Sequence, residues 1–359
     1  MGTEAAGMTG RDDVVNEGRL PTRMGDGTFA WLTRSEIRAD LEAGSEAAAT
    51  RAKLPPLTAD EIDHLLDIYA SPARFTGVDL GDEVVLSCDG TGMKTHATRI
   101  QDLQTYEQWM GADLLELCVG DYSLKVVRTI LAYEAQYMHD AQLATVAPVQ
   151  YGVMPNLGLY SKPDGPCDNW SELLPQGKID EARASQEEAV EMAVLDMVHL
   201  AESQYEAGAD AIDWDTTGAS GDPEFLAALR ATEIIHARYP DLGIQLGMAG
   251  EFVLGMHGKL TYKDTRLAGL WPREQLLLAQ QAGATMFGPV VNVNTGKSCA
   301  WNVARAVCLV KPCMEVAEIP VHMNAGMGVG AVPMFVHPPG DAVCRAAKAF
   351  VDLLRLDGL

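Results

Sequence analysis

A repeated junction between helix and strand constrains the fold of this chain more than any other sequence feature. The segments MGADLLELCVGDYS (110–123), AGADAIDWDTTG (207–218) and AGATMFGPVVNVNT (282–295) share one plan. In each, a helix is expected to end at a glycine, an apolar run forms a buried strand, and polar residues follow that strand. Three further segments follow the same plan after other turns: ATVAPVQYGVMPN (144–156), DLGIQLGMAGE (241–251) and EIPVHMNAGMGVG (318–330).

Helical patterns separate these strands, and strand–helix alternation indicates a parallel sheet covered by helices. The helical segments are 183–207, 223–238, 273–282, 300–317 and 340–355. An open doubly wound sheet and an eight-stranded barrel both satisfy this pattern. Polar residues follow every strand, which favours a (β/α)8 TIM-type barrel, because an open sheet gathers its ligand residues at one switch point.

The predicted strands end near Asp121, Tyr151, Asp215, Glu251, Asn292 and Asn324. Their regular spacing places the end of a seventh strand beyond Leu359. We therefore expect an incomplete barrel in residues 110–359, with about six strands and the start of a seventh. The ending LRLDGL is then a helix stop at Asp357-Gly358 followed by the first residue of that strand.

Residues 1–109 are predicted to form an N-terminal extension, a helical lead-in and short strands within 78–100. Thr33 with Glu36 predicts one capped helix that ends at Gly44, and Thr58 with Glu61 predicts a second.

Charge and cysteine content narrow the function classes. The net charge of −23 argues against a nucleic acid or an anionic membrane as partner, since phosphates need a cationic surface. It fits either simple solubility or a salty cytoplasm that screens the charge. Seven isolated cysteines without a Cys-x-x-Cys pair indicate reduced thiols in a cytoplasm. The sequence shows neither a secretory signal nor an apolar run long enough to span a membrane.

Carboxylates at two strand ends are the leading candidates for catalysis. Glu251 directly follows its strand, where it could bind an ammonium or move a proton, or cap the next turn. Asp213 and Asp215 flank Trp214 and therefore share one face of their strand. They could accept a proton, or one of them could be buried and paired structurally. No set of ligands with convincing metal spacing accompanies them.

Amide and imidazole side chains are candidates for orienting a substrate. Asn292 and Asn294 share one face of their strand end, and His322 and Asn324 share another. Tyr151 ends a further strand. The residues thus predict a site at the carboxyl ends of the strands, the mouth of the barrel, that suits a small amine or polar molecule. They supply no nucleophile or electrophile of their own.

Several long blocks resemble the dimethylamine methyltransferases of methylotrophic methanogens. They are MPNLGLYSKPDGP, GMAGEFVLGMHGKL, LAGLWP, FGPVVNVNT, AWNVARAV and GMGVG, together with RMGDG and LTADEID nearer the start. The likeness runs from about Arg23 to Leu359. It implies a cytoplasmic enzyme of methanogenesis that moves a methyl group from dimethylamine to the cobalt of a separate corrinoid protein. The cobamide belongs to that partner, so we expect no cofactor or metal on this chain, and a homo-oligomer at full length.

The resemblance also implies pyrrolysine, which follows Asp-Gly and one aliphatic residue in that family. Here LDGL is that context, so we expect pyrrolysine at position 360, encoded by an amber codon. Its ring imine would accept the amine, with Glu251 managing the proton and with Asp215, Asn294 and Asn324 orienting the bound amine. The 359 residues alone are then expected to be inactive. Two alternatives stay open: a pyrrolysine-free quaternary-amine methyltransferase of related barrel type, and an inactive fragment.

Overall fold

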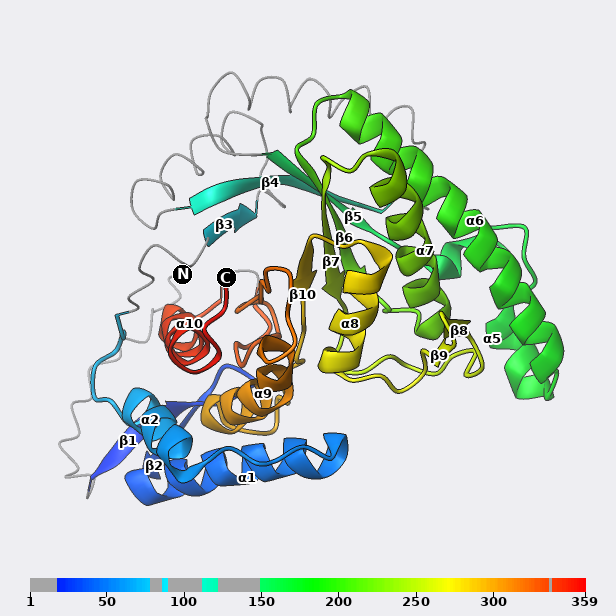
Figure 1. The fold of residues 1–359 in the computed structure, drawn as a ribbon. Coiled ribbons are helices and arrows are strands. Elements are labelled where there is room, and N and C mark those ends of the chain that lie inside the picture. The colour runs from blue at the N-terminus through cyan, green and yellow to red at the C-terminus, as the bar shows by residue number, and fades with distance from the viewer. Residues whose placement is uncertain (1–17, 78–85, 90–111, 122–148, 336–337) are drawn as a thin grey trace, which may run out of the picture.

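The computed structural model describes residues 18–77, 86–89, 112–121, 149–335 and 338–359 (Figure 1). Its centre is a parallel sheet in the order β10-β7-β6-β5-β4-β3. The strands are β3 (Leu86–Asp89), β4 (Ala112–Asp121), β5 (Val149–Met154), β6 (Ala211–Thr217), β7 (Gly243–Met248) and β10 (Met286–Gly288). The predicted parallel sheet with helices is confirmed.

The sheet continues past β10 through two parallel bridges, Phe287 with Val321 and His322 with Gly358. No pairing within the described ranges joins this end to β3, so a closed barrel is not found. The predicted strand count was one short. One short strand expected within 78–100 is β3, and it pairs with β4 in this sheet. Counted from β3, the backbone at the Gly358 bridge is therefore the eighth strand position of the sheet in chain order rather than the seventh. The division between residues 109 and 110 stays a prediction.

Helices cover the sheet from outside, and Figure 1 shows α6, α7 and α8 along one side of it and α1 lying along α9. The α-helices are α1 (Arg34–Ala52), α2 (Ala59–Tyr69), α5 (Trp170–Leu173), α6 (Ile179–Glu206), α7 (Asp222–Arg238), α8 (Pro272–Ala282), α9 (Cys299–Met314) and α10 (Gly340–Leu354). Short pieces are the 3-10 turns η1 (Leu157–Tyr160) and η2 (Leu174–Gln176), and the hairpin of β8 (Thr261–Tyr262) with β9 (Thr265–Arg266). Among the described helices, none is long and apolar enough to cross a membrane.

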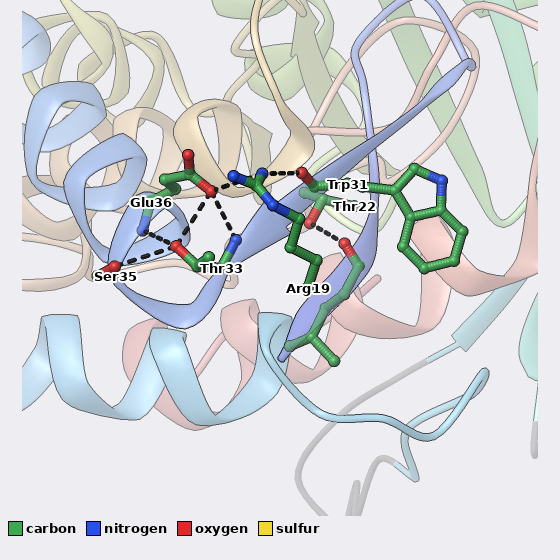
Figure 2. A network of polar contacts seen from close by, with 7 residues as sticks. Arg19, Thr22, Trp31, Thr33, Ser35 and Glu36 are labelled. Atoms are coloured by element: carbon green, nitrogen blue, oxygen red, sulfur yellow. Dashed lines mark hydrogen bonds and ion pairs between the residues drawn. The ribbon is translucent and has the colours of Figure 1, made fainter. Parts of the chain in front are cut away.

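The lead-in begins with a hairpin of β1 (Arg19–Arg23) and β2 (Phe29–Thr33) and continues into α1. The predicted capping box is present: the Thr33 hydroxyl accepts from the Glu36 amide, and the Glu36 carboxylate accepts from the Thr33 amide at 2.7 Å. Figure 2 shows this network extended by Arg19, which donates to Glu36 and to the Trp31 carbonyl. The cap therefore joins the hairpin to the helix. A second box at Thr58 and Glu61 begins α2 as predicted.

Two predicted helix stops were wrong. Gly44 lies inside α1, which continues to Ala52, and a Cβ at Gly44 would lie 2.1 Å from the Trp301 carbonyl oxygen. The glycine thus permits α1 to pack closely on α9 instead of ending a helix. At the other end of the chain, α10 stops at Leu354 because Arg355 adopts the left-handed conformation (φ 55°). Asp357 and Gly358 instead bond to Val321.

The register divides the sheet into two faces. Trp214, Leu246, Phe287 and Val321 lie side by side and are fully buried. Trp214 donates its indole N–H to Thr232 of α7 at 3.0 Å, so this face packs under the helices. The alternate residues therefore face the interior that the strands curve around.

Candidate active site

Three strands and the segment bridged at Val321 carry a row of interior residues. Asp213 of β6 lies opposite Gln245 of β7, and Gly247 of β7 lies opposite Gly288 of β10. His322 comes next, since the residue before it pairs with Phe287. The sequence prediction placed Asp213 and His322 at one mouth, and the register puts both on the interior face.

Two glycines of this row lie beside a buried carboxylate. An ideal Cβ at Gly247 would lie 3.4 Å from Asp213 Oδ1, and one at Gly288 would lie 3.1 Å from the Gly247 Cα and 3.4 Å from the His322 carbonyl oxygen. Asp213 is itself buried. Gly247 and Gly288 thus form a strip without side chains between Asp213 and His322, and neighbouring backbones approach one another closely along it.

His322 is a buried imidazole, and desolvation lowers its pKa below the ordinary value, although a hydrogen bond with the Leu359 backbone opposes the shift. At neutral pH the ring is therefore uncharged. It can accept or donate one hydrogen bond to a ligand, but it does not repel an ammonium group.

Glu251 forms a buried ion pair. Its Oε1 is paired with Nη2 of Arg305 on α9, and the two side chains are 10% and 8% exposed. The Glu251 Oε2 accepts from the Asn292 amide at 3.3 Å, and Arg305 Nη1 donates to the Asn292 carbonyl at 3.0 Å. The carboxylate thus follows its strand as predicted, but it also ties the loop after β7 to the loop after β10. Its role in proton transfer stays a prediction.

The loop after β10 carries both predicted asparagines, and both are exposed. Asn292 donates its side-chain amide to the Ala249 carbonyl at 3.3 Å. The Asn294 Oδ1 accepts from the Gly296 amide at 3.0 Å, which closes a tight turn. A buried residue absent from the sequence prediction, Asn302, accepts from the Asn294 amide and donates to its carbonyl.

The other predicted residues lie on other strands and loops. Asp215 is half-buried where β6 loses its regular register, directly before Thr216 with φ 55°. Asn324 is exposed on the loop after the Val321 bridge. In β5 the register sets Gly152, rather than Tyr151, opposite Asp213.

A buried carboxylate that sequence reasoning missed lies on the β6 side of the mouth. Glu224, in the first turn of α7, is fully buried and accepts amide hydrogen bonds from Gly218 at 2.9 Å and Ala219 at 3.0 Å. Longer bonds reach it from Ser220 and Leu157. Burial raises the pKa of Glu224 to about 6 against the opposing effect of these bonds. An acidic residue in a first helical turn resembles any helix cap, so only burial distinguishes this one.

A second carboxylate of α7 fixes the loop after β7. Asp222 accepts from the amides of His257 and Gly258, each at 2.8 Å, and His257 Nε2 lies 2.7 Å from Glu187 of α6. His257 is therefore held between α7 and α6 by these contacts. A shallow groove of about 470 Å³ lies beside it, lined by residues of α6 and the β8 region.

The family comparison decides between the possible uses of this mouth. The profile of the dimethylamine methyltransferase family matches residues 18–359, which is nearly the whole chain. The chain belongs to the dimethylamine methyltransferase family. It is therefore an enzyme of methyl transfer, as the sequence resemblance predicted.

Solved structures with a distant likeness to this dimethylamine methyltransferase are also enzymes. The metallated homocysteine methyltransferase MmuM from Escherichia coli matches at 13% identity with a TM-score of 0.40, over 75% of this chain and 96% of that one. A dihydropteroate synthase from Xanthomonas albilineans matches at 14% and 0.37, over 76% and 91%. A mandelate racemase/muconate lactonizing protein from Paracoccus denitrificans matches at 9% and 0.36, over 86% and 77%. At these scores the likenesses carry no argument about substrate or reaction.

Proposed function

We propose that this dimethylamine methyltransferase moves one methyl group from dimethylamine to the cobalt of a cognate corrinoid protein, leaving methylamine, in methanogenesis from methylamines. The observation that carries the proposal is the family match over residues 18–359.

The interior residues suit a small secondary amine. Dimethylamine is mostly protonated at neutral pH, so it must lose a proton before its nitrogen can react. Asp213 stands on the interior face, Asp215 follows two residues later on β6, and their carboxylates would supply negative charge for the ammonium form. His322 is uncharged there and can direct the N–H of the bound amine. These residues bind and orient the amine, and the carboxylates are positioned to take up its proton.

Two reactive groups come from outside the described residues. The first is pyrrolysine, which the family resemblance puts after Asp357, Gly358 and Leu359, and whose ring imine would supply an electrophilic carbon. The second is the cobamide of the partner protein, whose reduced cobalt would supply the methyl acceptor. The His322–Gly358 bridge supports this assignment, because it brings the Gly358 backbone beside the strip that ends at His322.

A spectroscopic assay tests this function. Full-length protein is mixed with dimethylamine and the corrinoid protein reduced to Co(I). We expect loss of the Co(I) absorbance and formation of methylamine in equal amounts, with trimethylamine and methylamine inactive as methyl donors. Methyl transfer from a quaternary amine, with none from dimethylamine, would overturn the proposal in favour of the related alternative.

A further inference from the structure

Two polar side chains stand one turn apart on the apolar helix α9 and both reach the same loop. Asn302 and Arg305 are 2% and 6% exposed, within a helix whose neighbouring residues are almost all buried. Residues three positions apart share a helix face. Asn302 holds Asn294 through both of its backbone groups, and Arg305 holds the carbonyl of Asn292. The loop after β10 is therefore fixed at two points by one helix.

Arg305 also connects this loop to the neighbouring one. Its Nη2 pairs with the Glu251 carboxylate, and its Nη1 donates to the Asn292 carbonyl. The Glu251 carboxylate in turn accepts a hydrogen bond from the Asn292 backbone amide. The three residues form a closed ring of contacts between the loops after β7 and β10. Gly250 lets the two loops approach, since a Cβ there would lie 3.1 Å from the Asn292 side-chain oxygen.

Stability alone does not explain such a pair. Removing both charges from water costs several kcal/mol, so a buried ion pair is often no more stabilising than apolar residues of the same size. The pair instead fixes the relative position of its two acceptors, the Glu251 carboxylate and the Asn292 carbonyl, because one guanidinium presents its donors at fixed angles.

We propose that Arg305 is a positioning residue of the methyl-transfer site, and that Asn302 assists it at the Asn294 end of the loop. This inference rests on the proposed function. In it, Arg305 sets where the Glu251 carboxylate and the Asn292 and Asn294 side chains stand at the mouth. A lysine could keep the charge, but its single nitrogen cannot hold Glu251 and Asn292 in the same geometry.

The test compares Arg305→Lys with Arg230→Lys. Arg230 makes a two-pronged ion pair with Glu191, at 2.5 and 2.8 Å, on the outer helices α7 and α6, so the control loses the same chemistry away from the mouth. We expect Arg305→Lys to lower kcat for methylation of the Co(I) corrinoid protein by on the order of 10- to 100-fold, as for a misplaced catalytic geometry. Arg230→Lys should keep the wild-type rate.

A double-mutant cycle excludes a merely structural role. If Arg305 acts through Glu251, Arg305→Lys should cost little more in a Glu251→Gln background, whereas independent effects would multiply. Circular dichroism confirms that each variant is folded. Multiplying effects, or a loss no greater than that of Arg230→Lys, would overturn the proposal.

Failure of the proposed function gives a different result. In that case wild type and Arg230→Lys would both be inactive with dimethylamine. Amide hydrogen exchange then tests the positioning itself: Arg305→Lys should speed exchange at Asn292 and Asn294 by about tenfold or more, the scale of a lost charged hydrogen bond. Unchanged exchange relative to Arg230→Lys would exclude the brace.

Discussion

Two buried glutamates stand near the carboxyl ends of neighbouring strands, and they are held by different means. Glu251, after β7, faces the guanidinium of Arg305. Glu224, in the first turn of α7, accepts backbone amides, and within the described residues no lysine or arginine side chain pairs with it. Each carboxylate ties two loops together: those after β7 and β10 in one case, and those after β5 and β6 in the other.

The difference shows that the same residue type can fix a loop with or without a full countercharge. Amide dipoles at a helix start stabilise a carboxylate only in part, so burial still raises the pKa of Glu224. A paired guanidinium supplies a whole opposite charge, so Glu251 depends on one side chain. The Glu251 side therefore depends on a single side chain, whereas burial of Glu224 makes its contribution to stability depend on pH.

Removing the guanidinium should have the largest effect. Arg305→Met leaves Glu251 buried without its partner, and we expect a loss of about 3–5 kcal/mol in the free energy of unfolding, measured by urea denaturation. Adding Glu251→Gln should restore part of this loss, because a neutral amide is less costly to bury than a charge. If the double variant is no more stable than the single one, the buried charge is not the cause.

Neutralising Glu251 itself should reduce catalysis. Glu251→Gln keeps the size but removes the charge and the proton affinity, so methyl transfer should fall by about 100-fold or more, the usual scale for a general acid or base. Single-turnover methylation of the corrinoid protein measures this. Glu191→Gln, in the outer ion pair with Arg230, is the matched control. A rate within the range of the control would leave Glu251 as a brace alone.

The fold was largely predictable because buried strands leave a strong local pattern. Apolar runs followed by polar residues located β4, β5, β6, β7 and β10, and the capping boxes located α1 and α2. The role of Gly44 was wrongly predicted because a glycine that ends a helix and a glycine where two helices cross look alike in sequence. Only the close approach of the Trp301 carbonyl identifies Gly44 as a crossing point. β3 was missed in the sheet because four residues carry too little pattern.

The site was predictable only in its strand-end residues. Asp213, Glu251 and His322 follow from position along the strands, but Arg305 and Asn302 act from a helix far along the chain. One signal was available: two polar residues three apart in AWNVARAVCLV are anomalous in an apolar helix, and a buried charge needs a partner. The identity of that partner depends on tertiary packing, which no local pattern contains.

Neutralising Glu224 should alter the pH dependence of stability. Its folded pKa of about 6 lies above the ordinary value of 4.5, so the folded state holds the proton more tightly than the unfolded state does. The wild type should therefore lose up to about 2 kcal/mol of unfolding free energy as pH rises through this window. Glu224→Gln should lack that component, and the exposed Glu188→Gln should retain it. If the unfolding free energies of wild type and Glu224→Gln change with pH in the same way, the amide hydrogen bonds offset the whole cost of burying the carboxylate.

The smallest expected effect concerns His322, at the end of the glycine strip. Burial lowers its pKa below the ordinary value of 6.5, so the unfolded chain binds a proton more readily than the folded one. Its contribution to stability is therefore complete above pH 6.5 and declines as the pH falls below that value, the opposite direction to Glu224. His322→Asn should remove this acid-side decline, whereas His199→Asn, on the exposed surface of α6, should not. Thermal unfolding between pH 5 and 7.5 would measure it, and an unchanged decline in His322→Asn would show that the ring is solvated and charged in the folded protein.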